Sequence, residues 1–245
     1  MLGTELAISL QTFTTVLARY NLGEPHITLV GGEQWYPPEQ RGQLVDAAHE
    51  ELAALGLFQR GRIDEGFLDT VRLLQRPSVE YYAFCRVSDK PSSVRAAFAG
   101  ERGIVAVSDA LTLRLLPTEP FRAALDAAHQ LPDTPPAALH SLSCALIDYE
   151  AIARGETLRG TASVADAKRA LTWLKKPWTG SGQMYAAIRD YSGRRVRSEE
   201  RAYWFDTSDG RFVAHVDRSG WLRILGADAG EVAGLWQRLE TGIRH

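Results

Sequence analysis

His215 and Asp217 are the two side chains whose spacing best suits acid–base chemistry. They lie two residues apart in the alternating segment 212–217, so both fall on one face of a predicted strand. An imidazole beside a carboxylate can serve as a general base with its orienting partner. The sequence places no nucleophile or third group beside them. We therefore favour an exposed strand face and keep a small-molecule enzyme that uses His215 and Asp217 as the alternative.

Other catalytic signatures are weaker. The segment Gly180-Ser181-Gly182 departs from the G-x-S-x-G pattern of a nucleophile elbow, and neither a Walker A motif nor G-x-G-x-x-G occurs. The histidines show no H-x-x-x-H spacing, and Cys85 and Cys144 have no C-x-x-C partner. Both cysteines lie in apolar patterns, which are typical of reduced thiols in a cytoplasmic protein. We expect no catalytic residue, no metal site and no cofactor.

The composition argues against several classes of protein. Apolar residues make up 45% of the chain and charged residues 24%, which is typical of a globular protein. A net charge of −2 gives no general attraction to nucleic acid. No apolar run is long enough to span a membrane, and the first ten residues lack the pattern of a signal peptide. We therefore expect no membrane insertion and a cytoplasmic location.

Apolar spacing and turn residues predict the elements that position these side chains. Helical spacing predicts helices at 12–19, 39–55, 64–75, 119–130 (with Phe121 inward), 163–176 and 228–241. A further helix is predicted to begin at Pro135 and Pro136 and to carry Leu142, Leu146 and Tyr149 on one face. Alternation predicts strands at 4–10, 79–87, 94–99, 104–107, 111–116, 183–190, 196–205, 212–217 and 221–225. Residues 88–93, rich in serine and proline, predict a loop.

The same order of elements occurs twice. Arg76-Pro77 after one predicted helix matches Lys176-Pro177 after another, and Leu74 matches Leu174. One half alone would leave a sheet edge and an apolar sheet face uncovered. We predict an α+β fold, an antiparallel β-sheet flanked by helices, built from two pseudo-two-fold-related halves. The halves are residues 1–132 and 133–245, which share one sheet as a single domain.

Aromatic residues at predicted strand ends and turns favour a binding protein over an enzyme. Amphipathic aromatics are the usual anchors of protein interfaces. The set is Trp35, Tyr36, Trp178, Tyr185, Trp204 and Trp221. A basic run nearby, made of Arg194, Arg195, Arg197 and Arg201, is interrupted by Glu199 and Glu200. This run predicts either a solvated hairpin tip or a contact with an acidic partner.

Several segments spread along the chain resemble the EspG family. They are residues 5–10 with Leu22-Gly23-Glu24-Pro25, residues 63–77 ending in Leu73-Leu74-Gln75-Arg76-Pro77, the strand meander of 98–115, and Asp209-Gly210-Arg211-Phe212 followed by 221–225. The resemblance implies an antiparallel sheet with helices and quasi-two-fold symmetry. It also implies a cytosolic chaperone of type VII (ESX) secretion, not an enzyme. Such a chaperone binds the tip of a helical PE–PPE heterodimer and keeps it soluble for export. We expect a monomer or weak homodimer.

The resemblance also implies where a partner binds, on the loop 88–93 and on the strands of 183–205. Along the first of these strands, Tyr185, Ala187 and Arg189 share one face, while Met184 and its alternate neighbours share the other. Helices must cover one face, and the other is available. The candidate partner-binding residues are Tyr185, Arg189, Arg195, Arg197, Tyr203 and Trp204. Tyr203 and Trp204 point to opposite faces, so one of them joins the available face, and the arginines suit helix C-terminal carbonyls or an acidic tip.

Overall fold

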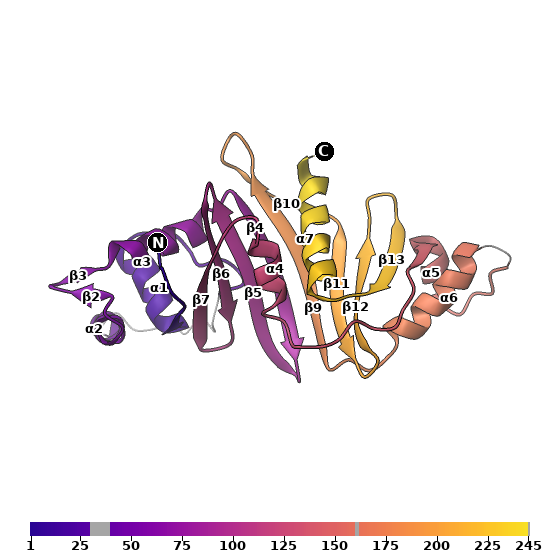
Figure 1. Ribbon diagram of the computed structural model, residues 1–245, viewed down its shortest axis with the longest axis horizontal. Helices are drawn as coiled ribbons and strands as arrows, with labels where there is room; N and C mark the ends of the chain where they lie inside the picture. The colour runs from indigo at the N-terminus through magenta and orange to yellow at the C-terminus, as the bar shows by residue number, and fades with distance from the viewer. Residues whose placement is uncertain (30–39, 160–161, 245) are drawn as a thin grey trace.

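A long antiparallel sheet crosses the molecule and carries helices on both faces (Figure 1). The computed structural model describes residues 1–29, 40–159 and 162–244. Their elements are β1 (Leu6–Ser9), α1 (Leu10–Arg19), α2 (Gln40–Ala54), β2 (Phe58–Gln59), β3 (Arg62–Ile63), α3 (Glu65–Gln75), β4 (Val79–Val87), β5 (Lys90–Ala99), β6 (Arg102–Ser108), β7 (Thr112–Thr118), α4 (Ala123–Ala128), β8 (Leu142–Ala145), α5 (Leu146–Ala153), α6 (Ala162–Leu174), β9 (Gly180–Arg189), β10 (Arg195–Arg197), β11 (Arg201–Thr207), β12 (Gly210–Val216), β13 (Trp221–Gly226) and α7 (Ala229–Arg244). The predicted α+β class is confirmed.

Strands β4 and β9 meet at the middle of the sheet. Ala83 lies opposite Met184, and the pairing runs out to Val79 with Ile188 and to Val87 with Gly180. Outward from this seam the order is β4-β5-β6-β7-β1 on one side and β9-β11-β12-β13-β8 on the other, and β10 pairs with β9 beside β11. The two-fold relation between residues 1–132 and 133–245 stays a prediction. It requires the strands to follow in corresponding order on the two sides of the β4–β9 seam, as they do.

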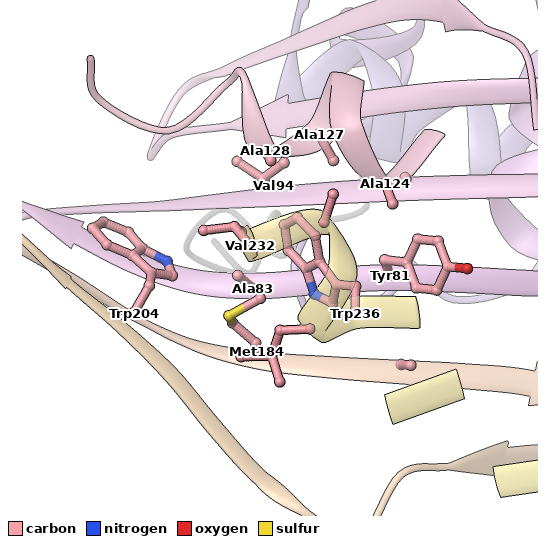
Figure 2. Close-up of a cluster of buried hydrophobic side chains, with 14 of the residues drawn as sticks. Tyr81, Ala83, Val94, Ala124, Ala127, Ala128, Met184, Trp204, Val232 and Trp236 are labelled. Atoms are coloured by element: carbon pink, nitrogen blue, oxygen red, sulfur yellow. The ribbon is translucent and has the colours of Figure 1, made fainter. Parts of the chain in front are cut away.

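Helices α4 and α7 cover the middle of one face of the sheet (Figure 1). Trp204 of β11 and Trp236 of α7 are completely buried there, with Tyr81 beside Trp236 (Figure 2). The short helix α4 contributes alanines, whose small side chains let it pack closely on α7 and the sheet. The indole of Trp204 lies across Gly180 and Gly182, where a Cβ would meet the ring. The Gly180-Ser181-Gly182 segment therefore makes room for a core tryptophan.

The other face is covered only toward its two ends. Helices α1 and α3 pack over β5, β6 and β7, and α5 and α6 pack over β8 and β13. The helix predicted at 39–55 is α2, which packs mainly on α1 rather than on the sheet. Among the described helices, none packs on this face over β4 and β9 at the centre of the sheet, whereas Phe205 of β11 is buried in the cluster to which α6 contributes. Over the described residues, helices therefore leave this central stretch of strand surface open, and residues 26–29 lie against part of it.

Two of the predicted helices are wrong at their boundaries or in their type. The helix predicted at 119–130 is limited to α4, and Phe121 is 76% exposed instead of buried. The segment expected to form a helix after Pro135 and Pro136 begins as extended chain, because Ala137 and Pro135 exchange backbone hydrogen bonds with Arg211 of β12. Leu142 then belongs to the edge strand β8, and α5 starts only at Leu146.

The loop predicted at 88–93 is a tight two-residue turn. Ser88 and Asp89 have φ angles of 47° and 63°, which is the left-handed geometry of a type I′ hairpin. Lys90 onward pairs with β4, so the segment does not fold over the side of the sheet. The single strand predicted at 196–205 is two strands, because Ser198 ends the pairing of β10 with β9 before β11 begins.

Replacing Gly226 with alanine should lower the free energy of unfolding by about 1–3 kcal/mol, because the added methyl would overlap the carbonyl oxygen of Ala137. The connection between α4 and β8 passes over β13 at this point, so the overlap is with backbone. Urea denaturation measures the loss. Gly234→Ala on helix α7 is the matched control, since its Cβ would meet nothing closer than 3.5 Å. Equal stability of Gly226→Ala and wild type would contradict the close approach.

Candidate protein-binding surface

The uncovered centre of the sheet is lined by aromatic side chains. Phe84 comes from β4, Tyr185 from β9, and Tyr203 and Phe205 from β11, because alternation turns these residues to the same side. Trp178, just before β9, lies over Phe205 with ring centroids 5.0 Å apart. We call these five residues the aromatic face, of which Phe205 is the buried member at 8% exposed. Tyr82, which is directly opposite Tyr185 in the pairing, points to the same side of the sheet and is fully buried.

The rings of the aromatic face and of Tyr82 are in contact with one another. Tyr185 stacks on Tyr82 at 5.1 Å between centroids and meets the edge of Phe84 at 6.2 Å. Tyr203 stacks on Phe205 at 6.1 Å. Phe84 is 38% exposed and Trp178 is 53% exposed, so large apolar area remains open to solvent. An exposed apolar stretch held in rigid strands is the usual preparation for a protein partner.

Positive charge borders the aromatic face. Arg197 of β10 lies over the ring of Tyr185 at 4.9 Å, and Arg195 lies over Tyr82 at 5.4 Å. On β4, the Arg86 side chain donates to the carbonyl oxygen of Asp89 at the hairpin turn. Burial raises the pKa of Tyr185, so its phenol stays neutral and can donate or accept a hydrogen bond. The surface therefore suits an apolar partner with acceptor groups around its contact.

The structure brings together three of the six predicted binding residues, Tyr185, Arg197 and Tyr203, on the uncovered face. Trp204 is on the opposite face, completely buried, so it is the neighbour that does not join. Arg189 donates to the carbonyls of Gly193 and Gln75 and thereby ties the hairpin to the end of α3. Arg195 forms an ion pair with the buried carboxylate of Glu80.

Sequence reasoning missed Phe84, Tyr82 and the buried carboxylate Glu80. The alternation of β4 contained the signal, because the residues between the inward set of Val79 to Val87 must face the other way. A strand with apolar residues on both faces is central in a sheet, so Phe84 was recognisable as a second-face aromatic. Trp35 and Tyr36, also predicted as binding aromatics, lie outside the described residues.

His215 and Asp217 do not form a pair. His215 Nε2 is 2.6 Å from Glu200 Oε2, and both side chains are largely buried on the side of the sheet that α7 covers. Asp217 instead accepts hydrogen bonds from the backbone of Ser219 and Trp221 and stabilises the turn before β13. The sequence missed Glu200 as the partner because the two residues are brought together by the β10–β11 connection.

Replacing His215 with alanine should cost about 1–2 kcal/mol of unfolding free energy, because it leaves the Glu200 carboxylate without its hydrogen bond. This corrects the expectation of an exposed strand position. Thermal and chemical denaturation measure the loss, and Glu199→Ala serves as a neighbouring control. Partner binding should not change, because His215 is on the far side of the sheet from the aromatic face. A variant as stable as wild type would contradict the role of this contact.

The two cysteines are not poised as nucleophiles. Both are buried and free. Burial raises the pKa of Cys85 to about 12 and that of Cys144 to about 11, so the thiols stay protonated at neutral pH. Across residues 1–29, 40–159 and 162–244, no group of three or more histidine, cysteine, aspartate or glutamate side chains could hold a metal ion. Over the same ranges, no helix is both long and apolar enough to cross a membrane.

The family comparison gives the affiliation of the chain. The model of the EspG family matches residues 9–237. A solved structure of the Mycobacterium tuberculosis type VII secretion system chaperone EspG5, in complex with a PE25–PPE41 dimer, is similar with a TM-score of 0.69 and 16% identity, over 97% of this chain and 96% of that one. An N-terminal dehydratase from the difficidin assembly line has a TM-score of only 0.13, at 13% identity over 73% of this chain and 87% of that one, and supports no argument. None of the curated proteins matches this sequence. Because the family model spans nearly all of the sequence and the fold is that of EspG5, the chain belongs to the EspG family.

Proposed function

We propose that this protein is a type VII secretion chaperone that binds the tip of a PE–PPE-type heterodimer through the aromatic face. The single observation that carries the proposal is the aromatic face, in which Phe84 and Trp178 remain exposed, in a chain of the EspG family. The structurally similar EspG5 was solved with a PE25–PPE41 dimer. Binding would cover the apolar tip of the heterodimer and keep the complex soluble in the cytoplasm until export.

The chemistry of the aromatic face fits a helical tip. Phe84, Tyr185 and Trp178 offer large rings that lose little conformational entropy on binding, since neighbouring rings already hold them. Arg197 can reach carbonyl oxygens at a helix C-terminus or a carboxylate on the tip. Helices border the surface toward both ends of the sheet, so a partner would sit between them.

We also propose that the protein is not an enzyme. His215 bonds to Glu200, and Asp217 stabilises a turn, so the alternative acid–base pair is not assembled. Both cysteines are buried, and their thiols remain protonated at neutral pH. We expect a monomer or weak homodimer that acts by binding alone.

Calorimetric titration of the purified chain with PE–PPE heterodimers from the same genome tests the proposal. We expect one heterodimer to bind with one copy of the chain and to co-elute as a ternary complex in size-exclusion chromatography. The PE–PPE helical tip should be necessary, so a heterodimer with its tip apolar residues replaced by serine is the control. Absence of binding to every pair would overturn the proposal.

A further inference from the structure

Glu80 is a buried carboxylate on the same side of the sheet as the aromatic face. It belongs to β4 and is flanked by Ala187 of β9 and Ala97 of β5 in the strand pairing. Arg197 of β10 pairs with the far side of Ala187. The two alanines leave space beside Glu80, and long side chains from neighbouring rows enter that space. Glu80 itself is only 2% exposed, so a docked partner cannot touch it directly.

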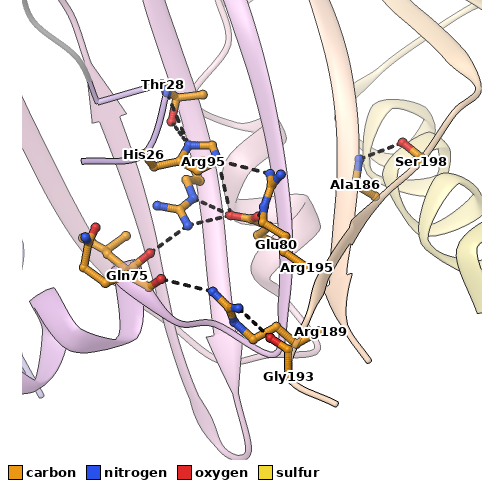
Figure 3. A network of polar contacts seen from close by, with 11 residues as sticks. His26, Thr28, Gln75, Glu80, Arg95, Ala186, Arg189, Gly193, Arg195 and Ser198 are labelled. Carbon is orange, nitrogen blue, oxygen red and sulfur yellow. Dashed lines mark hydrogen bonds and ion pairs between the residues drawn. The ribbon is translucent and has the colours of Figure 1, made fainter. Parts of the chain in front are cut away.

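Three segments of the chain send a basic side chain to this one carboxylate (Figure 3). Arg95 of β5 donates from Nε to Glu80 Oε2 over 2.7 Å and also donates to the carbonyl of Leu74. Arg195 of β10 donates from Nε to Glu80 Oε1. His26 Nε2 lies 3.7 Å from Glu80 Oε2 and 3.2 Å from a guanidinium nitrogen of Arg195.

The segment 26–29 lies against the sheet at this point. His26 meets the ring of Tyr82 edge-on, with centroids 5.0 Å apart, and the carbonyl of Thr28 accepts a hydrogen bond from Ser93 Oγ. Burial and the charge of Arg95 lower the pKa of His26 to about 3, so the imidazole is neutral at physiological pH. The two arginines therefore supply the charges that face Glu80.

Strand β10 has few other attachments. It is three residues long and pairs only with β9 among the described strands. The pairing ends at Ser198. The Ser198 N–H donates to the carbonyl oxygen of Ala186, and the Ala186 N–H donates to Ser198 Oγ. The ion pair of Arg195 with Glu80 links β10 across β9 to β4. The next residue of β10 on the same side is Arg197, which lies over Tyr185. The position of Arg197 thus depends on an anchor two residues away.

We propose that Glu80 is a positioning residue that holds β10 and residues 26–29 against the sheet and so presents Arg197 and Tyr185 to the partner. The proposal rests on the proposed function for its binding step, but its first step concerns the free protein alone. Burial by itself would raise the pKa of Glu80, but the guanidinium groups of Arg95 and Arg195 outweigh it and hold the pKa below its ordinary value. The carboxylate is therefore ionised at neutral pH and attracts both arginines.

Amide hydrogen exchange of free Glu80→Gln tests the first step. Relative to amides of β6 and β12, those of residues 28–29 and 195–197 should exchange on the order of tenfold faster than in wild type. Asp206→Asn is the matched control, because Asp206 is an equally buried carboxylate paired with Arg211 on the opposite face. That control should lose global stability without a selective effect at these residues. Unchanged exchange in Glu80→Gln, or the same selective increase in Asp206→Asn, overturns the proposal.

Calorimetry with the heterodimer tests the second step on folded protein. Glu80→Gln should bind on the order of tenfold more weakly, as for the loss of one interface anchor, while Asp206→Asn binds like wild type. Wild-type affinity in Glu80→Gln overturns the positioning role and leaves the proposed function standing. No binding by wild type overturns the proposed function, and the exchange result still decides whether Glu80 anchors β10.

A milder pair of variants covers the case in which Glu80→Gln does not fold. Arg195→Met removes the anchor of β10 and keeps the buried Glu80–Arg95 pair. Arg194→Met is its control, because within the part of the chain that the structure describes Arg194 bonds to Asp190 of the same hairpin and not to the sheet centre. Selectively faster exchange at 195–197 in Arg195→Met alone supports the proposal. Equal exchange in both variants overturns it.

Discussion

Asp206→Asn should lower the free energy of unfolding by about 3–5 kcal/mol, because it leaves the guanidinium of Arg211 buried without its counter-charge. Asp206 accepts hydrogen bonds from Arg211 Nε at 2.7 Å and Nη2 at 2.9 Å, and a third from Thr134. Both side chains of the pair are 2–3% exposed. Water cannot replace the lost partner at that depth, so the whole cost falls on the folded state.

The position of this ion pair adds to the effect. Arg211 also donates to the carbonyl of Pro132, so the pair holds the connection between α4 and β8 on β12. Equilibrium denaturation in urea, followed by tryptophan fluorescence, measures the loss. Glu5→Gln is the control, since Glu5 pairs with Arg114 in solvent and such pairs contribute less than about 1 kcal/mol. A loss in Asp206→Asn no larger than in the control would contradict the structural role of the pair.

Tyr185→Ala should weaken heterodimer binding by about 2–4 kcal/mol, the range of an aromatic hot spot at the centre of an interface. Tyr185 is the central ring of the aromatic face, in contact with Tyr82 and Phe84 and lying under Arg197. Its removal takes away apolar contact area and the ring on which the guanidinium rests. Isothermal titration calorimetry measures the change in dissociation constant.

The control must be an exposed aromatic residue outside the aromatic face. Phe121 is 76% exposed beside α4, which covers the other face of the sheet, so Phe121→Ala should bind like wild type. Both variants should melt cooperatively near the wild-type temperature, because neither ring is completely buried. Wild-type affinity in Tyr185→Ala would show that the partner binds elsewhere on the protein.

Alternation in the sequence was enough to predict most of the strands and the orientation of their side chains. The even and odd residues of 79–87 and of 183–190 lie on opposite faces as expected, because a strand has a side-chain period of two wherever it sits. The helices at 64–75 and 228–241 are also where the apolar spacing predicts them. Segments whose period is unambiguous were therefore predictable from local information.

The errors fall where tertiary contacts override local pattern. Residues after Pro136 have apolar spacing that suits a helix, but backbone pairing with Arg211 and then with β13 draws them into extended chain. Phe121 has the spacing of an inward residue, yet the helix begins after it. Local preference is a weak guide when a neighbouring strand offers hydrogen bonds to the same backbone.

Residue types and spacing by themselves determined the α+β class, the split of Tyr203 and Trp204 between two faces, and the absence of an obvious catalytic motif. Which face stays open was decided only by the tertiary structure, because helices α4 and α7 meet over the centre of one side while the other helices stay toward the ends of the other. Burial of Glu80 among Arg95, Arg195 and His26 was decided there as well. These groups are far apart in the chain, and no local periodicity encodes a contact that only strand pairing and loop placement create.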